Sequence, residues 1–345
     1  MATGTPPATD RSLSPWSAVA KVVVLLTLII TVLLIAFAWP AARSEVHDVP
    51  IAVAGPDAAV EQVAAALDQR LPDGFEITRV GGTAEAGQLI RDRDVYGAID
   101  VSAGAPRIVI ASAASSTVAQ ILRGLATGLS QAQGGTGAVA VRDLVPLPAD
   151  DPRGAGLSAG SLPLVMGGIL AAVLLTRFVL GTGRRVAGAF AFAVTGSLAM
   201  AAALQLWFGS LEGHYLANAG AIALTIAASS LTILGLESLL GYPGLGLGAV
   251  VMMVIGNPLA GTASAPEMLP GWSGELGQLM PPGAGGQLTR STAYFDGHGV
   301  AHPVVVLLCW LAVGLLLCLA SAVRARRAEA TEPARDTPAP CEDPA

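Results

Sequence analysis

The stretch LGLGAVVMMVIGNPLAG, residues 245–261, decides how the second half of this chain is built. Its first part is apolar enough to enter a bilayer, but Asn257 and Pro258 interrupt it before it ends. Proline removes a backbone donor and frees the carbonyl four residues earlier, which in lipid must be satisfied by protein or by water. We therefore expect a span over 245–263 whose broken end faces protein.

The following segment, residues 264–302, is predicted to build an outer lid on the membrane. Leucines recur at roughly helical spacing around Trp272, and the run is too short to span and too apolar for a free loop. Pro281 and Pro282 then break it, and the GAGG sequence after them predicts a tight return to the next span. Arg290 is the only basic residue of the segment. The alternative is an ordinary hydrophobic loop.

The composition predicts an integral membrane protein. Of 345 residues, 53% are hydrophobic and only 13% are charged. The 19 basic residues against 25 acidic ones form no basic stripe, so nucleic acid is not an expected partner. Cys309 and Cys318 lie in an apolar run and Cys341 near the end, which leaves no pair for a disulfide outside the membrane. Lys21 is the only lysine, so the chain cannot itself be a P-loop ATPase, and we expect no cofactor or metal.

Six segments are long and apolar enough to span the membrane, the run at 245–263 being the fifth. The other five are residues 19–39, 161–180, 186–208, 219–240 and 303–323. The first resembles a signal peptide with a cleavage site at Ala36–Ala38, but its length and the following Pro40 favour an uncleaved anchor.

Basic residues in the short flanks predict the orientation. They precede the first span, fill the turn between the second and third at Arg184 and Arg185, and follow the sixth. These three places are therefore expected on the same side of the membrane. We therefore expect a multi-pass protein of the plasma membrane with two cytoplasmic tails, residues 1–18 and a disordered 324–345, and with residues 43–158 outside.

The large segment between the first two spans alternates β-rich runs with helical ones. The predicted strands are residues 50–55, 75–81, 96–102, 106–112 and 141–147, and the predicted helices are 57–71, 84–93 and 115–133. This order predicts an extracytoplasmic α/β domain with a largely parallel sheet. The alternating charges of Arg91–Asp94 are typical of a solvated helix end.

Burying an ionisable side chain inside a membrane span costs free energy, so such a residue is expected to have a function. Arg177 and Glu237 lie near the same predicted face, and we expect them to form an ion pair, with simple snorkelling of the arginine as the alternative. Other polar side chains in the spans predict hydrogen bonds between helices rather than a solute path. They are Gln205, Ser229, Ser230 and Thr232.

One enzyme motif is present, and we do not expect it to be catalytic. Residues 156–160 match G-x-S-x-G, which in a hydrolase needs a preceding strand and a nearby histidine and acid. Here Ser158 stands just before a span, where serine is a common helix cap.

Three stretches carry a resemblance to a known family. They are PLPADDPRGAGLSAGSLPL (146–164), GNPLAGTASAPEMLP (256–270) and PPGAGGQLTRSTAYFDG (281–297). With the predicted order of spans, they resemble the ABC transporter type-2 permease superfamily, in particular its phage-infection-protein-like branch of Gram-positive bacteria. The resemblance implies export of a lipid, drug or envelope component by a permease dimer, driven by a separate nucleotide-binding subunit that binds ATP. It also implies that the turn 181–185 contacts the ATPase and that 266–290 forms an outer re-entrant hairpin.

The chain departs from that family pattern in two places. The turn between the second and third spans has only a few residues, and the N-terminal tail lacks room for the amphipathic helix usual before the first span. Both departures favour a second hypothesis, a non-transporting envelope receptor or secretion-assembly protein of the same branch.

Overall fold

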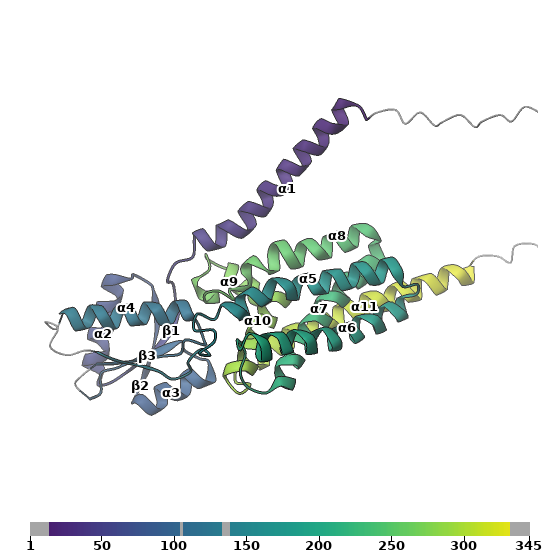
Figure 1. Ribbon diagram of the computed structural model, residues 1–345. Coiled ribbons are helices and arrows are strands. Elements are labelled where there is room, and N and C mark those ends of the chain that lie inside the picture. Colours follow the sequence, from purple (N-terminus) through teal and green to yellow (C-terminus); the bar gives the residue numbers. More distant parts are fainter. Residues whose placement is uncertain (1–13, 104–105, 133–138, 332–345) are drawn as a thin grey trace, which may run out of the picture.

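The computed structural model describes residues 14–103, 106–132 and 139–331, which form a helical bundle with a sheet at one end (Figure 1). Within this range five helices are long and apolar enough to cross a membrane. They are α1 (Trp16–Ala42), α5 (Ala155–Phe178), α6 (Thr182–Ala202) with its π-helical continuation η1 (Ala203–Trp207), α7 (Tyr215–Leu240) and α11 (Ala301–Thr331). The chain is thus a mostly helical protein with the features of a multi-pass membrane protein.

The tails differ from the prediction where they are described. Helix α11 continues to Thr331, so the first part of the tail expected to be disordered from residue 324 is helical. Residues 332–345 lie outside the described residues, as do residues 1–13 of the predicted N-terminal tail.

The predicted fifth span is not one continuous crossing helix. It consists of α8 (Tyr242–Val250), a π-helical segment η2 (Val251–Gly256) and a 3-10 turn η3 (Pro258–Ala260). The apolar helix from Tyr242 to Gly256 is shorter than the roughly 20 residues that a span needs. The break does fall at Asn257 and Pro258, and the buried Leu259 and Ala260 show that this end faces protein.

Helix α7 is the centre of the bundle and contacts α5, α6, α8, α10 and α11. Glycines let it approach α11 closely, because a Cβ added at Gly235 would lie 2.7 Å from the Gly314 carbonyl oxygen. Thr232 Oγ1 donates to the Trp310 carbonyl of α11 at 3.0 Å, and Asn218 of α7 donates to Gln205 at 3.1 Å. Thr232 and Gln205 therefore make the expected links between elements, whereas Ser230 donates within α7, to the Ala227 carbonyl at 3.4 Å.

The sheet module, residues 44–151, lies between α1 and α5 in the sequence. Its strands are β1 (Val49–Ala54), β2 (Phe75–Val80), β3 (Gly97–Asp100), β4 (Arg107–Ile110) and β5 (Ala140–Asp143). The order is β2-β1-β3-β4-β5, and only the β3–β4 pairing is antiparallel. Alternate residues of β1 enter two apolar cores, one with α2 (Asp57–Arg70) and α4 (Ser116–Ala132) and one with α3 (Thr83–Asp92).

The segment predicted to form a lid folds into two helices that enter the bundle. These are α9 (Ser273–Gln278) and α10 (Pro281–Tyr294), preceded by a 3-10 turn η4 (Pro266–Met268). Pro281 and Pro282 are the first two residues of α10. Backbone N–H groups in the first turn of a helix have no intrahelical acceptor, so the absence of an N–H in proline costs no hydrogen bond there. The GAGG sequence does not form the expected turn. It lies inside α10, where a Cβ at Gly286 would stand 2.6 Å from Thr262 Cγ2, so the glycines permit close packing.

Helix α1 is unlike the other long helices because none of its apolar window is buried. It contacts η2 and η3 only near its C-terminal end, where Pro40 is buried, and it slopes away from the bundle (Figure 1). Its first residue and the end of α11 both lie away from the sheet module. In this view the N-terminal end of α1 and the C-terminal end of α11 therefore both point away from the module.

Candidate functional site

The sheet module is fixed to the bundle by an arginine at the end of α3. Arg93 adopts a left-handed conformation, with φ of 69°, that turns its side chain toward α10. Its guanidinium donates to the carbonyl oxygen of Gln287 at 3.1 Å, to the side-chain oxygen of Gln287 and to Ser291 Oγ. It also lies over the ring of Phe295, 5.2 Å from the centroid. One side chain thus connects the module to two turns of α10 and the residue after it.

Two more contacts surround Arg93 at this junction. Tyr96 donates its hydroxyl to Glu267 Oε2 at 2.8 Å, which links the start of β3 to η4. Asp92 Oδ1 lies 2.7 Å from His298 Nδ1, in the loop between α10 and α11. Apolar packing supports them, since Ala265 and Met268 join one core of the module and Phe295 joins the other. We call residues 92–96 with their partners in 262–298 the module junction.

These contacts correct the prediction that Arg91–Asp94 form a solvated helix end. Arg91 and Asp94 are exposed, but Asp92 and Arg93 connect the module to the bundle. The alternating charges could not distinguish a solvated helix end from an interface, because the residues that Asp92 and Arg93 contact lie about two hundred residues later in the chain. The tyrosine that follows and the buried strand after it were the only local signs of an interface.

Two guanidinium groups, those of Arg93 and Arg290, act on one another and on the Glu267 carboxylate at the junction. Burial, followed by repulsion from Arg290, lowers the pKa of Arg93 to about 10. Burial and then the Glu267 carboxylate raise the pKa of Tyr96 above its ordinary value, so the phenol is neutral at physiological pH. Glu267 is therefore the carboxylate that faces two guanidinium groups here.

Arg290, the predicted basic residue of the lid, is the second of these guanidinium groups. It lies on α10 and is only 6% exposed. Its Nη2 donates to the Thr262 carbonyl at 2.8 Å, while its Nε has no hydrogen-bond partner. Ser158 also donates to the Thr262 carbonyl, at 3.2 Å, so the serine of the hydrolase-like motif is a contact between helix and loop.

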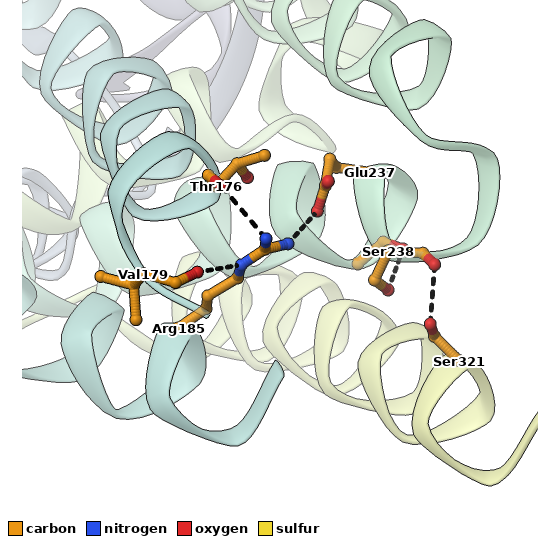
Figure 2. A network of polar contacts seen from close by, with 7 residues as sticks. Thr176, Val179, Arg185, Glu237, Ser238 and Ser321 are labelled. Carbon is orange, nitrogen blue, oxygen red and sulfur yellow. Dashed lines mark hydrogen bonds and ion pairs between the residues drawn. The ribbon is translucent and has the colours of Figure 1, made fainter. Parts of the chain in front are cut away.

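A second polar cluster, drawn in Figure 2, lies at the α5–α6 connection, at the end of the bundle away from the sheet module (Figure 1). There Arg185 donates through Nε to the Val179 carbonyl at 2.8 Å and through Nη2 to the Thr176 carbonyl at 3.1 Å. Its Nη1 lies 3.0 Å from Glu237 Oε2. We call Arg185, Glu237 and these two carbonyls the distal clamp. Because the groups come from α5, α6, α7 and the turn between α5 and α6, the clamp joins three helices.

The distal clamp extends to a fourth helix. Ser321 of α11 donates to the Ser238 carbonyl at 2.6 Å, as Figure 2 shows, and Arg324 donates to the Leu239 carbonyl at 3.2 Å. The carbonyls at the end of α7, which lack intrahelical partners, therefore receive donors from α11.

Glu237 does form an ion pair, but the prediction that its partner is Arg177 is wrong. Glu237 is paired with Arg185, whereas Arg177 is exposed in the last turn of α5, where the alternative hypothesis of snorkelling places it. The turn between α5 and α6 brings Arg185 back toward α7, a geometry that hydropathy does not encode. Arg184, its neighbour in the predicted ATPase-contact turn, is exposed.

The remaining predicted site residues lie along the lid. Trp272 is 69% exposed on the short connection before α9, and Leu279 is also exposed. Asn257 is partly buried at the end of η2, and its Oδ1 has no hydrogen-bond partner. The lid thus presents an aromatic and a leucine outward, while α10 is enclosed by the bundle and the sheet module.

Comparison with protein-family models, curated proteins and solved structures finds no match to this chain. Its function is therefore inferred from the sequence pattern and from the geometry of the module junction and the distal clamp.

Proposed function

We propose that this chain is the membrane-spanning permease subunit of an ABC-type exporter that moves a lipid, drug or envelope component outward, powered by a separate ATPase chain. In this proposal the sheet module is an extracytoplasmic α/β domain inserted after the first of six crossings, the fifth being completed by η2 and η3. The distal clamp lies on the cytoplasmic side of the plasma membrane, and the protein works as a dimer.

The observation that carries the proposal is the buried hairpin of α9 and α10. Helix α10 has 14 residues, fewer than the roughly 20 that a crossing needs, yet it packs against α5, α7 and α11. Helix interruptions and non-helical backbone at membrane depth are typical of protein-lined routes rather than of simple anchors. The sheet module contacts this hairpin through Arg93, and in this proposal the module controls its position.

A second function, a non-transporting receptor or secretion-assembly protein, is favoured by the turn between α5 and α6. The turn consists of three residues, 179–181, and Arg185 beside it is turned inward to the distal clamp. A partner ATPase would find only a small exposed surface there, with Arg184 at its centre.

Purification of the full chain from its own cells in a mild detergent tests the two functions against each other. The exporter proposal expects a P-loop ATPase to co-purify in stoichiometric amount. We expect Arg184→Ala to reduce that association and export at least tenfold, because Arg184 is the exposed basic group of the turn, while the unfolding temperature stays at the wild-type value. Full association and export in the variant would remove the turn from the coupling route. A stable external partner with no ATPase would favour the receptor or assembly function.

A further inference from the structure

An apolar pocket opens in the sheet module between helices α2 and α4. Its volume is about 210 Å³, and part of its wall comes from residues in or next to β3 and β4. The two helices supply Val63, Ala66, Leu67, Arg70, Leu125 and Leu129. Except for Arg70, every side chain of the wall is aliphatic or proline, so the pocket favours an apolar occupant.

The pocket is open because α2 carries a small side chain at its edge. Val63, Ala66, Leu67 and Arg70 lie three or four positions apart and therefore share one face of the helix. Leu67 is buried in the core of the module, whereas Ala66 beside it is exposed and has only a methyl group. The aliphatic side chains around Ala66 therefore stay within reach of a ligand, and Val63 is only partly buried although it packs against the core.

The neighbouring segments of the chain hold no large apolar side chain for this pocket. The stretches of the module outside the described residues, 104–105 and 133–138, contain only glycine, alanine, glutamine and threonine. An apolar cavity of about 150 Å³ admits benzene, whereas pockets for drug-sized ligands have about 300–1,000 Å³. The volume of about 210 Å³ therefore suits an alkyl chain of medium length.

Arg70 is the charged group of the wall and lies in the last turn of α2. Its Nη1 reaches α4, because a Cβ added at Gly128 would lie 3.1 Å from it. Arg70 makes no ion pair within the described part of the chain. The nearest acid in sequence, Asp68, points to another side of the helix, where its Oδ1 accepts the Asp73 N–H at 3.4 Å. This guanidinium therefore complements a ligand that carries a negative charge at the end of its apolar part.

We propose that the pocket binds an anionic amphiphile, with the alkyl chain among the aliphatic side chains and the carboxylate or phosphate paired with Arg70. The chain provides most of the affinity, about fourfold in Kd for each methylene removed from water, because an exposed ion pair contributes little. Selection comes from the combination of chain and charge, since the pocket is open on one side. The site does not rest on the proposed transport function, because the module of a receptor would bind the same class of ligand.

Photoaffinity labelling of the full chain in lipid nanodiscs tests the site. The probe is decanoic acid with a diazirine near the end of its chain, and labelled peptides are identified by mass spectrometry. We expect label in α2 and α4, with competition by octanoate or octyl phosphate, since a guanidinium pairs with either anion. The stronger of the two competitors identifies the head group. Label confined to the long apolar helices, or no competition by either anion, would overturn the proposal.

Three variants at exposed positions of α2 assign the label to this pocket. Ala66→Phe places a ring at the edge of the pocket and should remove most of the label, whereas Ala65→Phe, at a position that does not line the pocket, should keep it. Arg70→Gln should raise the half-competing concentration of octanoate at least threefold and leave that of neutral octan-1-ol unchanged. The unfolding temperature confirms that each variant is folded. Equal labelling of Ala66→Phe and Ala65→Phe, or an octanoate response unchanged in Arg70→Gln, would contradict the assignment.

Discussion

Replacement of Arg185 by methionine is expected to destabilise the folded chain by about 3–5 kcal/mol, the usual cost of removing one partner of a buried ion pair. The Arg185 and Glu237 side chains are only 20% and 12% exposed, so the Glu237 carboxylate would stay largely buried without its counter-charge. The Thr176 and Val179 carbonyls would lose their donors at the same time. The measurement is the unfolding temperature in detergent together with the yield of monodisperse protein.

The chain offers a matched control for this prediction. Arg177→Met removes an exposed arginine one helical turn from the same connection and should leave both readouts near the wild-type values. Arg185→Met combined with Glu237→Leu should recover part of the loss, because no buried charge is then stranded. If Arg177→Met were as damaging as Arg185→Met, the distal clamp would be assigned to the wrong arginine.

The second large effect is expected at the module junction. Arg93→Met removes hydrogen bonds to two residues of α10 and the contact with Phe295, and hydrogen bonds from a charged group contribute about 1.5–3 kcal/mol each. We expect the module to loosen from the bundle without unfolding, because its own two apolar cores are untouched. Amide hydrogen exchange should rise at least tenfold in α10 and stay unchanged in β1 and in the centre of α7.

Arg91→Met provides the comparison for Arg93, since it removes an exposed arginine from the same turn of α3. Its exchange pattern should match that of the wild type. Equal protection of α10 in Arg93→Met and in Arg91→Met would show that Arg93 does not hold the lid.

Hydropathy was sufficient to locate the long helices, because burial in lipid requires about 20 apolar residues regardless of their partners. Five predicted spans coincide with long helices to within a few residues at most ends, and the strands of the sheet module lie within four residues of their predicted bounds. The break at Asn257 and Pro258 was also predictable, since proline acts through its own backbone.

The residues that hold these elements together could not be predicted in the same way. Glu237 is paired with Arg185 because a three-residue turn sets which arginine returns to α7, and Arg177 matches it equally well in sequence. The GAGG sequence was mistaken for a turn because glycine serves both tight turns and close helix packing, and only the presence of α5, α7 and η3 around α10 decides between them. The orphaned Nε of Arg290 has no sequence signature at all.

Cysteine accessibility in intact cells tests the central claim, that the sheet module and the distal clamp lie on opposite sides of the membrane. In a background with Cys309, Cys318 and Cys341 changed to alanine, one cysteine is introduced at Glu61, an exposed position of the module, or at Arg184 beside the distal clamp. A membrane-impermeant maleimide should label Glu61→Cys in intact cells and should label Arg184→Cys only after permeabilisation. Labelling of both positions in intact cells, or of Arg184→Cys alone, would contradict that claim.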